Sequence, residues 1–404
     1  MKEDKTTLFE NNNTVMLNKI KIPVAIQITI DDLGWHDGRD YTSIGRASRS
    51  GIPRDHVLSD YQFMNELGRA LNQKILGKLC LADWDKDNLL RGEIGITDDP
   101  INWDRAHTID MDYARACFEE MEKSEYLEYC VHSVMHGRYD ETGHVITEKE
   151  LFEKQEGGGW LPISSEELDR RLDLFFKIYD SWGFKQKLKV YGAPCGAPEQ
   201  LSGVQLAGLN AVLYKYGIRY FRTHWAYFHS YEENVSFPVK YIASNRRLAI
   251  AMPWDKYDVD VKSLPDAYRP GEKNIWGLIA LHWTNFLRLD PEENFKYLPD
   301  WIDYFNRQSE YFGAMISRDF EFSAIQQFYY HFAKVDFVDG AYTIDLSYLL
   351  AQNFDDIKKE FYISLANGVT PKACEGGELE LYEEKRDFKT YKVSYTGDCV
   401  KISV

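Results

Sequence analysis

Short apolar runs alternate with longer amphipathic stretches along this chain up to about residue 315. Seven runs have the length and the aliphatic content of buried strands, and they cover residues 22–30, 77–82, 127–131, 188–191, 218–221, 248–252 and 275–281. Five stretches have apolar residues at helical spacing, at residues 60–73, 112–123, 165–182, 202–216 and 294–312. Because strands that alternate with helices build parallel sheets, the chain predicts a seven-stranded barrel related to the (β/α)8 fold.

Polar or aromatic side chains follow each predicted strand directly. Asp31 and Asp32 end the first strand, His132 follows the third, and His282 ends the last. The carboxyl ends of barrel strands meet on one face, where enzymes of this architecture keep their active sites. We therefore expect these side chains to share one site.

The adjacent acids Asp31 and Asp32 indicate a metal site. Two carboxylates at the end of a buried strand need partners, and a cation would supply one. His132 and His136 are four residues apart, so a helical turn would project both rings to one side. One carboxylate and two imidazoles accept zinc, cobalt, nickel or iron and leave a position open for water. The second carboxylate is then available as a general base, and His282 as the group that protonates the leaving atom.

The pattern changes after residue 317 to short alternating segments. Apolar and polar residues alternate over 320–331 and 335–346. Asp339 and Gly340 are a predicted hairpin turn within the second segment. Residues 361–365, 378–382, 391–395 and 400–404 read as further short strands. These features predict an N-terminal leader at 1–20, a barrel at 21–317 and a small C-terminal β-sandwich domain at 318–404.

Composition restricts the class of partner. A formal net charge of -16 argues against nucleic acid and against anionic membranes, since both require basic patches. No apolar run reaches the ~20 residues that span a bilayer. The six cysteines form no CxxC pair and the first residues contain no apolar signal segment, so we expect reduced thiols and a cytoplasmic location. The oligomeric state is left open.

Three segments resemble motifs of the NodB-type polysaccharide deacetylases, carbohydrate esterase family four. Residues 29–32 (Thr-Ile-Asp-Asp) resemble the family's T-F-D-D motif. Residues 132–136 (His-Ser-Val-Met-His) fit its H-[ST]-x-x-H motif, and residues 279–282 (Ile-Ala-Leu-His) are similar to its L-x-H motif. The resemblance covers roughly residues 20–315 and implies a distorted (β/α)7 barrel, an α/β fold.

The resemblance also implies a role for each motif residue. Asp31 would be the catalytic base, and Asp32, His132 and His136 would bind the metal, usually zinc. His282 would be the catalytic acid.

Two other motifs of the family are altered in this chain. The third reads R-x-P-[YF]-G in the family, and its best match here has Gly192 in place of the arginine and Cys195 in place of the aromatic residue. Arg222, one strand later, is our candidate for the missing charge, and the backbone N–H of Cys195 for the oxyanion contact. For the fourth motif the nearest matches are 224–225 and 254–255, so we expect Trp254, with His36 from the loop after the first strand, to line the substrate site.

Three functions remain open from the sequence. The first is a metal-dependent hydrolase that removes an acetyl or other acyl group from an amide nitrogen of a carbohydrate. The second is a hydrolase of a small non-sugar amide or cyclic imide, which the lack of a signal segment favours. The third is a catalytically degenerate carbohydrate-binding protein, because the third motif is altered.

Overall fold

The computed structural model describes residues 13–34, 52, 54, 56–195, 203–223, 238–269, 271–272, 275–351 and 357–404. Within these residues, no helix combines the length and the hydropathy needed to cross a membrane.

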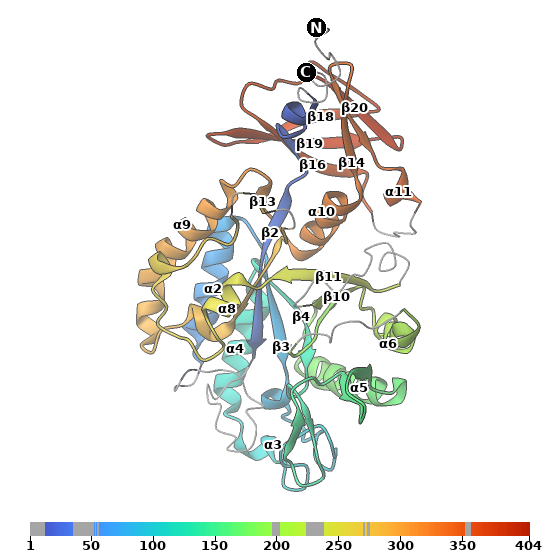
Figure 1. Cartoon of the computed structure of the whole chain (residues 1–404). Coiled ribbons are helices and arrows are strands. Elements are labelled where there is room, and N and C mark those ends of the chain that lie inside the picture. The colour runs from blue at the N-terminus through green and yellow to red at the C-terminus, as the bar shows by residue number, and fades with distance from the viewer. Residues whose placement is uncertain are drawn as a thin grey trace.

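Seven parallel strands form a closed barrel, which confirms the predicted fold class (Figure 1). Each strand pairs with the next in chain order, and β12 pairs with β2 to close the sheet. The strands are β2 (Val24–Leu33), β3 (Ile75–Cys80), β4 (Leu127–Ser133), β9 (Val190–Gly192), β10 (Tyr220–Thr223), β11 (Lys240–Asn245) and β12 (Leu278–His282).

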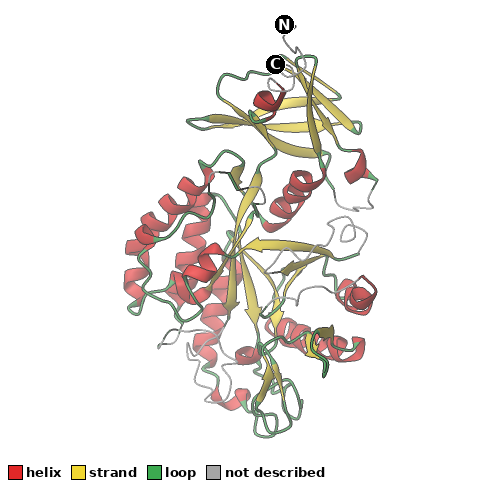
Figure 2. Ribbon diagram, in the orientation of Figure 1, coloured by secondary structure: helices red, strands yellow, loops and turns green. Residues whose placement is uncertain are grey.

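Helices cover the outside of the barrel (Figure 2). They are α2 (Leu58–Leu71), α4 (Met111–Lys123), α5 (Ser165–Trp182), α6 (Gly203–Lys215), α8 (Arg247–Ala251) and α9 (Leu298–Ser309). The short helix α3 (Arg105–Thr108) lies in the connection between β3 and β4 and buries none of its residues. The longest, α5, begins where the Ser164 side chain accepts a hydrogen bond from the backbone N–H of Glu167, at 3.2 Å. It ends at Gly183, whose φ of 85° is the left-handed cap that glycine allows.

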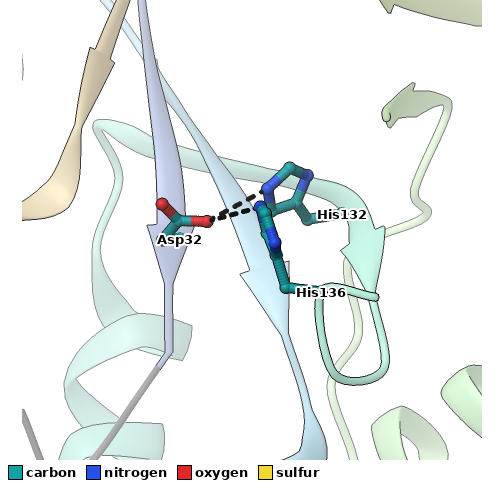
Figure 3. A group of neighbouring side chains, drawn as sticks. All are labelled: Asp32, His132 and His136. Atoms are coloured by element: carbon teal, nitrogen blue, oxygen red, sulfur yellow. Dashed lines mark hydrogen bonds and ion pairs between the residues drawn. The ribbon is translucent and has the colours of Figure 1, made fainter. Parts of the chain in front are cut away.

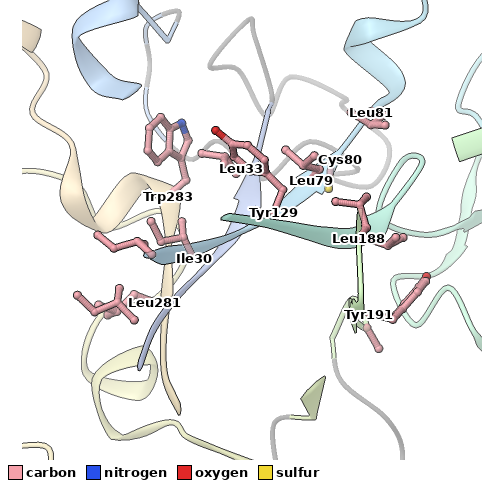
Figure 4. Close-up of a cluster of buried hydrophobic side chains, with 14 of the residues drawn as sticks. Ile30, Leu33, Leu79, Cys80, Leu81, Tyr129, Leu188, Tyr191, Leu281 and Trp283 are labelled. Carbon is pink, nitrogen blue, oxygen red and sulfur yellow. The ribbon is translucent and has the colours of Figure 1, made fainter. Parts of the chain in front are cut away.

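The outward side chains of the strands and the inward faces of these helices form one apolar core. Leu79, Tyr129 and Tyr191 belong to it, and Figure 4 shows them with their neighbours. Tyr191 also stacks on Phe221 of the next strand, with 5.7 Å between ring centroids. This core holds the strands so that their alternate residues face the barrel interior.

One predicted strand is wrong. The run at 248–252 is not a strand: residues 248–251 belong to the short helix α8, with Leu248 buried and Ile250 68% exposed. The sixth barrel strand is instead β11, which starts at Lys240 and was not predicted. Five apolar residues in a row fit one helical turn as well as one strand, so the run alone does not decide between them.

The C-terminal part contains two four-stranded antiparallel sheets. One sheet is β1 (Ile20–Lys21), β16 (Glu360–Ala366), β19 (Phe388–Tyr395) and β18 (Gly377–Glu384), and the other is β14 (Lys334–Val338), β15 (Ala341–Asp345), β20 (Cys399–Ser403) and β17 (Ala373–Glu375). The predicted hairpin turn is confirmed: Asp339 and Gly340 join β14 to β15 with φ of 51° and 78°. A two-residue turn of this kind requires positive φ at both positions.

The predicted strand at 320–331 is also wrong, because these residues form the helix α10 (Phe320–Phe332). Asp319 caps it by accepting from the backbone N–H of Phe322 at 2.7 Å. The helix packs on the end of the barrel where the strands begin, next to β13 (Ala314–Ile316), which pairs with β2. Gln326 donates to the carbonyl of Pro23 at 2.8 Å, and Gln327 accepts from the N–H of Gly277 at 3.0 Å.

The C-terminal sheets therefore lie at the amino ends of the barrel strands, away from the face that carries the predicted site (Figure 1). The smaller elements are β5 (Arg138–Tyr139), β6 (Val145–Thr147), β7 (Phe152–Lys154), β8 (Trp160–Pro162), α11 (Ser347–Leu350) and the 3-10 turns η1 (Ala82–Trp84), η2 (Val261–Ser263), η3 (Trp283–Phe286) and η4 (Pro291–Tyr297).

Candidate metal centre

A β-bulge at the end of β2 brings both carboxylates to the same site. The pairing of β2 with β3 runs Ile30 to Gly77 and then Leu33 to Leu79, so β2 contains one extra residue. Asp32 lies in this bulge with a φ of 66°. Adjacent residues of a regular strand point to opposite faces, and a bulge re-aims one of them. The bulge thus explains how Asp31 and Asp32 can both face the barrel interior.

The two histidines come together through a tight loop rather than the helical turn that we expected. β4 also has an extra residue, since Leu79 pairs with Val131 and Cys80 with Ser133, and His132 lies at this irregularity. The Ser133 hydroxyl accepts a hydrogen bond from the backbone N–H of His136 at 2.6 Å. His136 has a φ of 45°. Left-handed backbone at a non-glycine residue is strained, and such strain concentrates at functional sites.

Asp32, His132 and His136 converge (Figure 3). The Nε2 atoms of the two rings lie 3.1 Å and 3.4 Å from the same Oδ1 of Asp32. All three residues are buried, at 5% exposure or less. Donor atoms around a tetrahedral zinc ion, bound at ~2.0–2.1 Å, lie ~3.3 Å from one another. The spacing of these atoms therefore fits a common metal ion.

The hydrogen bond of the other ring nitrogen supports this fit. Nδ1 of His132 is the donor to the carbonyl oxygen of Gly192, so a neutral ring in this position would present the lone pair of Nε2 to Asp32. A lone pair that faces a carboxylate oxygen is repelled unless a proton or a cation lies between them. The three residues could hold a metal ion, and the donor set does not specify which one.

The Asp32 carboxylate is ionised in this environment. Burial raises its pKa, but the neighbouring His136 and His132 more than offset that effect and lower the pKa to about 2. An ionised carboxylate is the form that binds a metal.

Asp31 lies between two buried cations. The Nζ of Lys78 is 2.5 Å from its Oδ1, and the Nη1 of Arg222 is 3.2 Å from its Oδ2. Lys78 and Arg222 are both fully buried, at 0% exposure. Burial and the nearby Arg222 lower the pKa of Lys78 to about 8, against the opposing attraction of Asp31. The structure thus pairs Arg222 with Asp31, as the sequence suggested. It also adds Lys78, a second cation that was not predicted.

Lys78 was missed by the sequence reasoning, although a signal was present. It is the charged residue within the otherwise apolar strand β3, and its side chain faces the barrel interior. A lysine in a buried strand requires a charged partner, and the adjacent acids were the candidates.

His282 lies beside Asp31 on the neighbouring strand. The two residues are partners in the pairing of β12 with β2, so their side chains project to the same side. Burial lowers the pKa of His282, and the attraction of Asp32 and Asp31 opposes this shift. Across the described residues, Nδ1 of His282 makes no hydrogen bond.

Three further predicted residues are Cys195, Trp254 and His36. The Cys195 thiol donates to Glu148 at 3.3 Å and its carbonyl accepts from Lys149 at 2.9 Å, with a φ of 50°. Trp254 follows the helix α8 and not a strand, so the reason for placing it at the site is lost. His36 lies outside the described residues. The substrate contacts of all three stay predictions.

The strand pairing defines the class of fold as a parallel seven-stranded (β/α) barrel with C-terminal antiparallel sheets. No protein-family model matches the chain, and no curated protein is significantly similar to it. Among solved structures it is similar to a 4-alpha-glucanotransferase from Thermococcus litoralis, with 11% identity and a TM-score of 0.33 over 73% of this chain and 39% of that one.

A second solved structure is an endogalactoceramidase, with 9% identity and a TM-score of 0.28 over 95% of this chain and 96% of that one. The chain spans well under half the length of the glucanotransferase. At these TM-scores neither likeness supports a conclusion about activity. The assignment of a function therefore rests on the residues of the site.

Proposed function

We propose that this protein is a metal-dependent hydrolase that removes an acyl group, typically acetyl, from an amide nitrogen of a carbohydrate. The observation that carries the proposal is that the two adjacent acids have different partners. Asp32 faces two imidazoles, whereas Asp31 faces two cations and the neighbouring His282. The carbohydrate part of the proposal rests on the three motifs that resemble NodB-type deacetylases.

Asp32, His132 and His136 would hold the metal ion, with zinc as the expected metal. Bound there, a divalent ion would polarise the substrate carbonyl and lower the pKa of water towards ~7. The ionised Asp32 and the lone pair on Nε2 of His132 are what such an ion requires from this chain.

Asp31 would accept the proton of the attacking water. The ion pairs with Lys78 and Arg222 supply the counter-charges of its carboxylate and hold that carboxylate at the end of β2. His282 would donate a proton to the departing nitrogen, and within the described part of the chain its Nδ1 makes no hydrogen bond. This pairing of a base and an acid is the usual arrangement for amide hydrolysis.

The test is a substrate panel on protein loaded with one equivalent of Zn²⁺ or Co²⁺. N-acetylated sugars and their oligomers are compared with ureides and cyclic imides by following the release of acetate or the opening of the ring. Turnover of the sugars supports the proposal, and turnover of the ureides or imides alone replaces it with a small-amide hydrolase. If the protein binds sugars, binds no metal and turns over no substrate, it is a degenerate binding protein.

The variant Asp31→Asn separates the two roles. We expect it to keep its metal, measured by elemental analysis, and to lose at least ~100-fold in kcat, since a positioned general base contributes ~10²–10⁴-fold. Asp336→Asn, at an exposed strand position, is the matched control. Wild-type turnover in Asp31→Asn would rule out Asp31 as the base.

A further inference from the structure

Inside the barrel, the long side chain of Lys78 passes through the space that a side chain at Gly192 would occupy. Lys78 on β3 and Gly192 on β9 both face the interior, on either side of β4. An ideal Cβ at Gly192 would overlap Cδ of Lys78 and would lie 3.2 Å from its Cγ and 3.3 Å from its Cε. Gly192 is not among the glycines with positive φ, so its backbone does not require glycine. The lack of a side chain at 192 is instead what gives the lysine stem its space.

We propose that Lys78 is a positioning residue for Asp31, and that the lack of a side chain at Gly192 leaves room for the lysine stem in the conformation that reaches Asp31 on the neighbouring strand. The proposal rests on the proposed function in that Asp31 is taken as the base. Arg222 holds one oxygen of the carboxylate and Lys78 holds the other. Two cations on separate oxygens restrain the rotation of a carboxylate about its χ2 bond, and the loss of Lys78 removes one of these two restraints.

A misplaced base costs rate rather than substrate affinity. An error of ~1 Å in the position of a reacting group lowers the rate on the order of 100-fold. Lys78 is fully buried and reaches the site only through Asp31, so it contributes no substrate contact of its own. Its loss should therefore change kcat and leave KM and metal content unaltered.

The test compares Lys78→Met, which keeps the length of the side chain, with Lys187→Met at an exposed loop position as the control. We expect kcat to fall on the order of 10–100-fold in Lys78→Met, with KM and zinc content within about twofold of wild type. A crystal structure of this variant should show the Asp31 carboxylate rotated from its wild-type orientation. Unchanged kcat, or an unchanged carboxylate, overturns the proposal.

Gly192→Ala tests the same idea with the lysine charge retained, and serves if Lys78→Met does not fold. The new methyl group should displace the lysine stem and lower kcat in the same way, but it should cause no additional loss in a Lys78→Ala background. Equal losses in both backgrounds overturn the proposal. If the wild type turns over no substrate, the proposed function fails, whereas the orientation of Asp31 in the Lys78→Met or Gly192→Ala crystal structure still decides the positioning role.

Discussion

The charge cluster around Asp31 predicts that Asp31→Asn destabilises the protein as well as inactivating it. The substitution keeps the shape of the side chain but leaves Lys78 and Arg222, both fully buried, without a counter-charge. Removing one partner from a buried ion pair costs about 3–5 kcal/mol, because the remaining charge stays desolvated. For a chain of 404 residues the entropy of unfolding is ~0.85 kcal/mol/K, so the melting temperature should fall by about 4–6 °C.

The assay is urea unfolding followed by fluorescence, together with calorimetry of the metal-free protein so that metal binding does not contribute. The double variant Asp31→Asn/Lys78→Met removes one uncompensated cation and should recover more than half of the lost free energy of unfolding. Asp336→Asn is the control at an exposed position and should remain within ~0.5 kcal/mol of wild type. If Asp31→Asn unfolds within ~1 kcal/mol of wild type, the reasoning about the two cations is refuted.

Three further predictions concern the metal, the pH dependence and the C-terminal helix. His132→Ala should reduce bound zinc from about one equivalent to less than ~0.1 in elemental analysis. The control His107→Ala, at an exposed position, should leave the zinc content unchanged. A zinc content in His132→Ala equal to that of wild type would refute the site. Burial lowers the pKa of His331 to about 3, so the folded protein keeps this ring neutral while the unfolded chain protonates below ~6.5. Stability should thus decline as pH falls from 6.5 towards 3, and His331→Phe should show a smaller difference in urea midpoint between pH 7 and pH 5. Asp319→Ala removes the cap of α10 and should cost about 1 kcal/mol in the same assay, and a neutral effect would show that the cap is dispensable.

The barrel was predictable from the sequence because its helices and most of its strands have distinct periodicities. α5 covers residues 165–182 as expected. α10 was mistaken for a strand since its apolar residues satisfy two patterns at once. Phe320, Ala324 and Phe328 have helical spacing, but the aromatic residues between them also produce an alternating pattern.

The site was only partly predictable. The order of Asp31, Asp32, His132 and His136 along the chain, and their places at strand ends, pointed to one cluster. The bulges that aim these side chains depend on the register between strands, which no local pattern encodes. The contact of Lys78 with Asp31 similarly requires knowing which residues of β3 face inward, and that follows from the closure of the whole barrel.

The late position of the C-terminal sheets in the chain has a consequence for synthesis of the protein. Strand β12 closes the barrel at His282, but β20, the last strand of the C-terminal sheets, ends 121 residues later at Ser403. At ~5–20 residues per second, a ribosome needs ~6–24 s to synthesise that interval. Until α10 is made, the apolar end of the barrel where the strands begin is uncovered, and until β20 is made the C-terminal sheets beside it are incomplete, so the nascent chain exposes apolar surface that can aggregate. Slow codons or stalling in this part of the message should therefore reduce the yield of folded protein more than stalling before β12.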